Sequence, residues 1–184
     1  VTSNAAEYDA FALTPRVPRM LIQYGAARTA TTLQFQIMCA AMFLLHQNTP
    51  QKVRCRFWSG LKPNDRILLP PAADSFEVVK THVLPDNIAQ LRRHAWLFAT
   101  SVSAANGTNL TQELGMEVKL LQDYEMLRHH GYRVATKYQQ ILSLSKPQVD
   151  DLLEYLRYWV VLRQCCGMQM SAEWRARLVE GPTH

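Results

Sequence analysis

The chain has 184 residues, of which 48% are hydrophobic and 19% are charged. This length and composition predict one globular domain with a sizeable core, and they exclude a disordered or collagen-like chain. The formal net charge of +5 and the pI of about 9.2 favour anionic ligands or partners. Because the basic residues are scattered, we expect no nucleic-acid interface, and because no apolar run reaches the roughly 18 to 20 residues of a membrane span, we expect no transmembrane segment.

Residues 1–18 contain two prolines and little periodicity, so we expect an extended N-terminal lead-in, followed by a single domain over 19–184. The next residues predict a buried strand over 20–24, a loop over 25–30 and a long apolar helix over 31–46. The first N–H groups of such a helix lack internal partners and carry the positive end of the helix dipole, so an anion fits there. Arg28 adds a positive charge, and the hydroxyls of Thr29, Thr31 and Thr32 can donate hydrogen bonds to it.

The loop is not a Walker A motif. When GxxxxGK[ST] is laid on residues 25–32, Ala30 stands where the second Gly belongs and Thr31 where the Lys belongs. Hydrolysis of ATP or GTP is therefore not expected.

Further elements follow along the chain. We expect a half-buried edge strand over 53–58, a strand over 76–82, a short helix over 87–93 capped by Asp86, and a strand over 94–102. The apolar stripe within 111–130 predicts a helix closed by Gly131, after which 132–138 predicts a strand. A long helix is expected from Ser145 to Gly167, and a final short helix capped by Ser171.

Strands separated by helices predict a three-layer α/β/α fold with a central, mainly parallel sheet. Ligands of such folds bind at the carboxyl ends of the strands. Arg28, Lys80, His82 and Thr100 all fall at such ends, which predicts that they share one site.

Residues 27–33, Ala-Arg-Thr-Ala-Thr-Thr-Leu, resemble the 5′-phosphosulfate-binding loop of the sulfotransferases, whose pattern is Pro-Lys/Arg-Ser/Thr-Gly-Thr/Ser-Thr-Trp/Leu. Residues 76–82 resemble the second strand of that family, which ends in Lys-Thr-His. The resemblance implies a P-loop-like fold, PAPS as sulfuryl donor with PAP as its product, a hydroxyl- or amine-bearing acceptor, and no metal. It further implies that His82 is the general base, that Lys80 contacts the sulfuryl group and that Arg28 binds the phosphosulfate.

The family holds the 3′-phosphate of its nucleotide with an Arg and a Ser, and Thr100 and Thr108 fall near those two places here. A late segment, 166–175, weakly resembles another nucleotide-binding stretch of the family, and 137–142 weakly resembles the end of a further strand. The residues that the resemblance implies as nucleotide contacts are Arg28, Thr29, Ala30, Thr31, Thr32, Thr100, Thr108, Arg163, Trp174 and Arg175.

Several departures from the family pattern keep other functions open. Ala27 replaces its Pro, Ala30 its Gly, Leu33 its adenine-stacking aromatic and Thr100 its Arg, and a Thr hydroxyl cannot replace a bidentate phosphate clamp. The alternative is a catalytically degenerate member of this fold that serves a structural or binding role in a larger complex, in an organelle or at a membrane. A kinase with an altered loop is a third option, opposed by the missing Walker Lys.

The cysteines and histidines do not form a metal-binding pattern. Cys39, Cys55, Cys165 and Cys166 contain no CxxC pair, the six histidines are not spaced with them as ligands, and the adjacent Cys165 and Cys166 are poorly placed to bridge each other. Asn106 and Asn109 begin glycosylation tripeptides, which matter only in the secretory route. No targeting segment is visible, so the Golgi lumen, the cytoplasm and an organelle all stay open.

Overall fold

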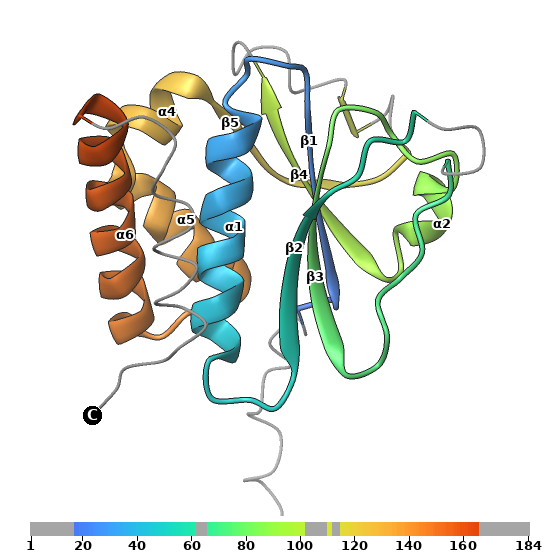
Figure 1. Cartoon of the computed structure of the whole chain (residues 1–184), viewed down its shortest axis with the longest axis horizontal. Helices are drawn as coiled ribbons and strands as arrows, with labels where there is room; N and C mark the ends of the chain where they lie inside the picture. Colours follow the sequence, from blue (N-terminus) through green and yellow to red (C-terminus); the bar gives the residue numbers. More distant parts are fainter. Residues whose placement is uncertain (1–16, 62–65, 102–109, 112–114, 166–184) are drawn as a thin grey trace, which may run out of the picture.

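The computed structural model describes residues 17–61, 66–101, 110–111 and 115–165, with the backbone alone described for 158–165 (Figure 1). A five-stranded sheet forms its centre, in the order β2-β3-β1-β4-β5, and every neighbouring pair of strands is parallel. The strands are β1 (Met20–Gly25), β2 (Lys52–Phe57), β3 (Ser75–Thr81), β4 (Ala95–Ser101) and β5 (Val118–Asp123). The expected parallel sheet is therefore confirmed.

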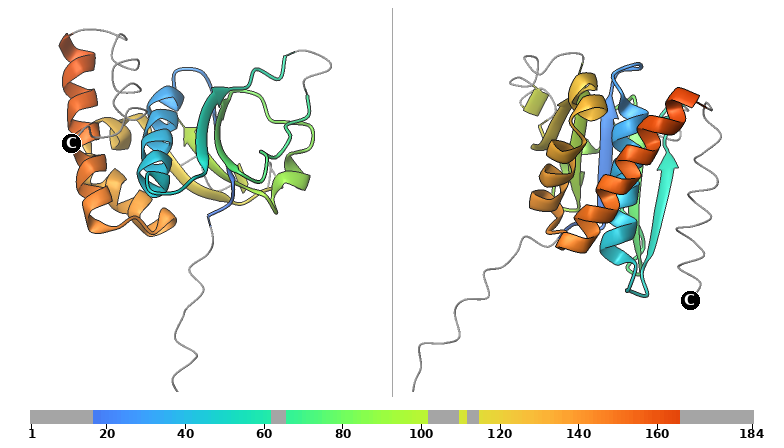
Figure 2. Two further views of the ribbon diagram at one scale, coloured as in Figure 1. Left: turned by 60° about the horizontal axis from the view of Figure 1, so that its bottom comes forward. Right: turned by 90° about the vertical axis from the view of Figure 1, so that its left-hand side faces the viewer.

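Helices cover the sheet unequally, as the two views of Figure 2 show. The helices are α1 (Thr31–His46), α2 (Ile88–Leu91), α4 (Tyr124–His129), α5 (Gly131–Leu142) and α6 (Lys146–Cys165). One face packs against α1, α5 and α6, while the other carries the short α2 and the segment around Trp58 and Leu68. The arrangement is that of a three-layer α/β fold with one thick and one thin outer layer.

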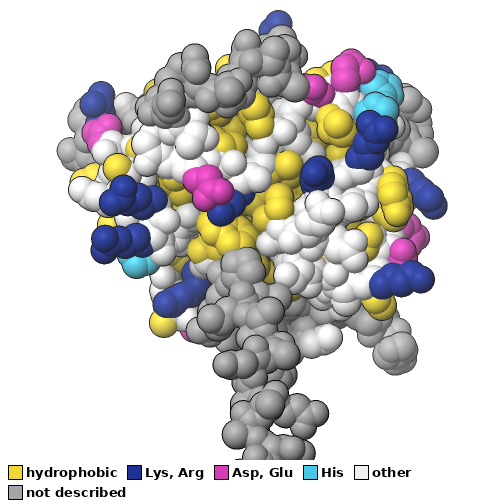
Figure 3. All heavy atoms as spheres, turned by 180° about the vertical axis from the view of Figure 1, so that it is seen from behind, with side chains coloured by type: hydrophobic (Ala, Val, Ile, Leu, Met, Phe, Trp, Pro, Cys, Tyr) yellow, Lys and Arg dark blue, Asp and Glu magenta, His cyan; other side chains and the backbone are white. Residues whose placement is uncertain are grey.

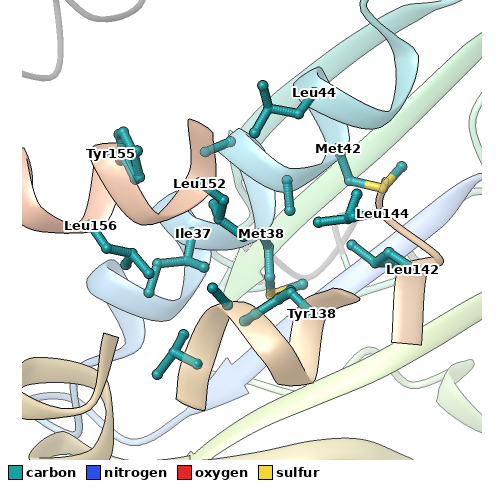
Figure 4. Packing of buried hydrophobic residues seen from close by; sticks show 14 of the residues in the cluster. Ile37, Met38, Met42, Leu44, Tyr138, Leu142, Leu144, Leu152, Tyr155 and Leu156 are labelled. Carbon is teal, nitrogen blue, oxygen red and sulfur yellow. The ribbon is translucent and has the colours of Figure 1, made fainter. Parts of the chain in front are cut away.

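The central strand β1 is buried on both faces, which explains its continuous apolar sequence. Leu21 belongs to the larger core beneath α1, α5 and α6, whereas Met20 and Ile22 belong to the smaller core on the opposite face. Figure 4 shows how Met38 of α1 and Tyr138 of α5 meet in the larger core. Alternate side chains of this strand thus bind both outer layers to the sheet.

The edge strand β2 is tied to α1 by a disulfide that the sequence analysis did not predict. Cys39 and Cys55 form it across a separation of 16 residues, with their Cα atoms 6.2 Å apart. On the opposite face of β2, Arg56 pairs with Glu77 of β3 through bonds of 2.7 and 3.2 Å. The edge of the sheet is therefore fixed from both sides.

The prediction of a helix over 111–130 was wrong. Residues 118–123 pair with β4 as a strand, and the helix α4 begins only at Tyr124, where the Asp123 carboxylate accepts a 2.7 Å bond from the Met126 N–H. Apolar residues three and four apart fit a helix, but pairing with a buried neighbour strand prevails over that local pattern.

The prediction of a strand over 132–138 was also wrong, because these residues lie in α5. Its buried residues, Val134, Ala135, Tyr138 and Leu142, lie on one helical face. The weak resemblance of 137–142 to a strand end therefore has no structural counterpart. The predicted cap of α2 was wrong as well, since Asn87 occupies that position without a side-chain cap and Asp86 pairs with Arg66 at 3.9 Å. The helix expected after Ser171 lies outside the described residues.

Candidate functional site

The carboxyl ends of the parallel strands gather the predicted site residues at one edge of the sheet. In the register of the sheet, Gly25 lies opposite Thr100 of β4, and Tyr24 lies opposite Thr81 of β3. The chain leaves β1 toward β2 on one side and leaves β4 toward β5 on the other. In folds of this kind, ligands bind at the point where the connections from two adjacent strands run in opposite directions, which here is between β1 and β4.

The loop between β1 and α1 has an unusual backbone. Arg28 and Ala30 both have positive φ, 68° and 63°, and Ala30 is the N-cap of α1. Its methyl group cannot accept a hydrogen bond from the first N–H groups of the helix, and the first turn contains no acidic residue. The start of this 16-residue helix therefore keeps its positive character.

Two buried hydroxyl groups form a hydrogen bond between this loop and β4. The Thr29 and Thr100 hydroxyls lie 2.8 Å apart, and Thr29 also donates to the Ala26 carbonyl at 2.8 Å. Gly25 passes so close to Thr100 that an added Cβ would overlap the Thr100 hydroxyl and lie 2.9 Å from its carbonyl oxygen. Thr29 and Thr100, both predicted as ligand contacts, thus hold the loop against β4.

Lys80 reaches the start of α1 from β3. Its ammonium donates a 2.7 Å hydrogen bond to the hydroxyl of Thr32, the second residue of the helix, and lies 5.9 Å from the centre of the Phe57 ring. Partial burial lowers the pKa of Lys80 from its ordinary value. A cation is therefore placed beside the helix N-terminus.

His82, which follows β3, is anchored to the end of β1, where the same loop begins. Its Nδ1 lies 2.7 Å from the Gly25 carbonyl oxygen, and its ring lies 5.8 Å from the Phe57 ring. Since a carbonyl oxygen can only accept, Nδ1 carries the proton in this bond. In the neutral imidazole, Nε2 then has a free lone pair and no hydrogen-bond partner within the described part of the chain.

The remaining predicted residues divide into three groups. Arg28 and Thr32 are exposed, while Thr31 is buried against Gly25. Arg163 lies in α6, where the backbone alone is described. Thr108, Trp174 and Arg175 lie outside the described residues.

Sequence reasoning missed a buried amide network beneath the site. Gln34 donates to the Ala99 carbonyl and to the Gln122 side chain, both at 3.1 Å, and Gln23 donates to Gln34 and Thr100 at 3.4 Å. These glutamines are almost fully buried and join β1, β4, β5 and α1. The sequence does show single glutamines in otherwise apolar segments, which indicates buried polar groups. Which glutamines contact one another depends on the order of the strands in the sheet.

The described residues lack the features of two other classes of function. They contain no group of three or more His, Cys, Asp or Glu side chains arranged to hold a metal ion. None of their helices has both the length and the apolar character needed to cross a membrane. Comparison of the whole chain with protein-family models, with curated proteins and with solved structures gives no match.

Proposed function

We propose that this protein transfers a sulfuryl group from a nucleotide 5′-phosphosulfate, which is PAPS in the family that it resembles, to a hydroxyl or amine acceptor. The observation that carries the proposal is the pair formed by Lys80 and His82 around the β1–α1 loop. Lys80 places its ammonium at the helix start, and His82 is held in the tautomer whose Nε2 can accept a proton.

The residues of the loop fit a phosphosulfate group. The uncapped N-terminus of α1, the exposed Arg28 and the Lys80 ammonium together offer hydrogen-bond donors and positive charge. Gly25 lets β1 pass close to β4, so the loop begins at the level of the strand ends. Tight anchoring of Thr29 keeps these donors in place before a ligand binds.

The proposed reaction needs one proton acceptor and one cation. The acceptor oxygen or nitrogen forms a bond to sulfur as the bond between sulfur and the bridging oxygen breaks, and the electron pair of that bond stays on the phosphate oxygen. His82 Nε2 takes the proton of the acceptor, and Lys80 stabilises the charge that grows on the leaving oxygen. The Gly25 carbonyl stabilises the imidazolium that results, because its oxygen accepts the Nδ1–H bond.

The test is the rate of sulfuryl transfer in His82→Ala. We expect the rate to fall about 100-fold or more while the affinity for PAP, measured by calorimetry, stays unchanged, because a general base acts in the transition state. His94→Ala is the matched control, since His94 is exposed at the opposite end of the sheet. An unchanged rate in His82→Ala would overturn the assignment of the base.

A second candidate function is a binding subunit of this fold that has no catalytic activity. It is favoured by Thr100, whose hydroxyl is buried and bonded within the protein instead of facing a ligand. Exposed apolar side chains that could meet a protein partner are Phe57, Leu61, Ile67, Leu69, Val83 and Tyr132. Binding of PAP without transfer to any hydroxyl or amine in an acceptor panel would favour this candidate over the enzyme.

A further inference from the structure

We infer that the acceptor carries its hydroxyl or amine on a flat apolar ring, and that Phe57 is the residue that contacts this ring. This inference rests on the proposed function, and it names the class of acceptor for the same site. It depends on the position of Phe57 at the end of β2, beside both side chains of the proposed reaction.

Phe57 lies at nearly equal distances from the proposed base and from the proposed cation. Its ring centre is 5.8 Å from the His82 ring centre and 5.9 Å from the Lys80 ammonium nitrogen. In the proposed reaction the sulfuryl group passes from an oxygen beside Lys80 to an acceptor atom beside His82. Phe57 therefore borders the space in which the transfer takes place, and the atoms that carry the acceptor group come next to its ring.

The exposure of Phe57 gives such a contact an energetic effect. Phe57 is 55% exposed, although Trp58, the next residue, is 4% exposed. A single exposed aromatic side chain is common at protein surfaces, so the exposure alone indicates no function. Here, however, a ligand that reaches the base and the cation also covers the apolar surface between them. Removal of that surface from water favours an acceptor with an apolar body.

Several contacts hold Phe57 in this position. β2 lies beside β3 (Figure 1), with Phe57 in register with Lys80, and the Trp58 N–H donates a 2.9 Å hydrogen bond to the Lys80 carbonyl. Two residues before Phe57, on the same face of β2, Cys55 is joined to α1 by the disulfide. A ring that is fixed in advance loses little conformational entropy when a ligand stacks on it.

The turn after β3 adds a second apolar side chain next to His82. Val83 is 40% exposed, and the buried Thr81 hydroxyl donates to its carbonyl at 2.6 Å and accepts from its N–H at 3.0 Å. His82 thus has one exposed apolar neighbour along the chain and another, Phe57, on the adjacent strand. A planar ring stacks on an aromatic side chain with an attraction beyond that of the buried area alone, which favours an aromatic acceptor.

The experiment measures binding of the sulfated product, so it needs no turnover. Calorimetry on the full chain with PAP present measures the Kd of phenyl sulfate and of methyl sulfate, which share the sulfate group and differ in the body that carries it. We expect phenyl sulfate to bind about tenfold more tightly in wild type, and the two sulfates to bind with similar affinity in Phe57→Ala. Phe57→Tyr keeps the ring and should keep the preference. Tyr132→Ala, the matched control, removes an exposed aromatic side chain from α5 and should leave the preference unchanged.

Each other result has a definite meaning. Equal affinities of the two sulfates in wild type, with PAP bound, would overturn the inference and leave the sulfotransferase proposal standing. An equal loss of affinity for both sulfates in Phe57→Ala would also overturn it, because Phe57 would then act by positioning Lys80 and not by contact with the acceptor. Failure of PAP to bind at millimolar concentration would overturn the proposed function and this inference with it.

Discussion

At the scale of single residues, Arg28 is the basic residue of the β1–α1 loop, and its side chain forms no hydrogen bond or ion pair with another described residue. Its backbone adopts φ of 68° and its side chain is exposed next to the start of α1. Arg28→Ala is expected to weaken nucleotide binding by about 1.5 to 3 kcal/mol, the range for hydrogen bonds to charged groups. Calorimetry measures the change, and Arg28→Lys should recover part of it because the charge returns without the planar fork. Equal affinity in Arg28→Ala would place the anion elsewhere.

His46 makes the stability of the fold depend on pH. It stacks on Phe76 with ring centres 3.8 Å apart, its Nε2 is buried without a hydrogen-bond partner in the described structure, and burial lowers its pKa below 6.5. The unfolded chain therefore binds more protons than the folded one just below pH 6.5, so stability falls as the pH drops through that window.

Denaturant unfolding between pH 5 and 8 measures this dependence. His46→Phe, which keeps an aromatic ring against Phe76, is expected to flatten the curve near pH 6. His94→Gln, at an exposed position, should leave it unchanged. An identical pH dependence in wild type and His46→Phe would contradict the prediction.

At the scale of elements, the disulfide between α1 and β2 attaches an edge strand to the helix that begins at the site. Closing a loop of this length in the unfolded chain contributes about 3 kcal/mol in the chain-entropy model. Cys39→Ser is expected to lower the free energy of unfolding by about that amount, measured by urea denaturation. Reduced wild type should match Cys39→Ser, and a reducing agent should leave Cys39→Ser itself unaffected.

The elements around the loop were predictable from the sequence because local signals agreed there. An apolar run, a loop of small residues and a long apolar stretch predicted β1 and α1, and the strand before Lys80 and His82 followed from its apolar residues. The segment that contains β5 failed because its conformation depends on pairing with β4, a partner distant along the chain. The sequence analysis identified the residues of the candidate site that lie at strand ends. It could not predict the network of Gln23, Gln34 and Gln122, because these residues meet only through the order of the strands.

At the scale of the whole molecule, the arrangement of the strands decides where the functional groups lie. On the face shown in Figure 3, apolar side chains gather in the middle, and most of the described Lys and Arg side chains lie toward the left and right edges. The gathering of functional groups at one end of the sheet follows from its topology. It arises because all described strands are parallel and so end at the same edge.

Binding at this edge should stabilise the entire domain, because the site uses β1, β3 and α1 together. A ligand at 100 times its Kd adds about 2.7 kcal/mol to the free energy of unfolding. For a domain of this size we expect PAP to raise the Tm by several degrees, measured by scanning calorimetry. Absence of a shift in wild type, or an equal shift in Arg28→Ala, would speak against the loop as the binding site.

The close approach of Gly25 to Thr31 and Thr100 has an evolutionary consequence. A Cβ at position 25 would meet the side chains of both threonines and the backbone of Thr100, so these three positions share one small volume. Homologous sequences should therefore keep glycine at 25, because smaller residues at 31 and 100 relieve only the side-chain contacts and leave the Thr100 carbonyl oxygen 2.9 Å from the added Cβ. Any lineage that acquires a large side chain at the end of β4 must keep glycine at the end of β1.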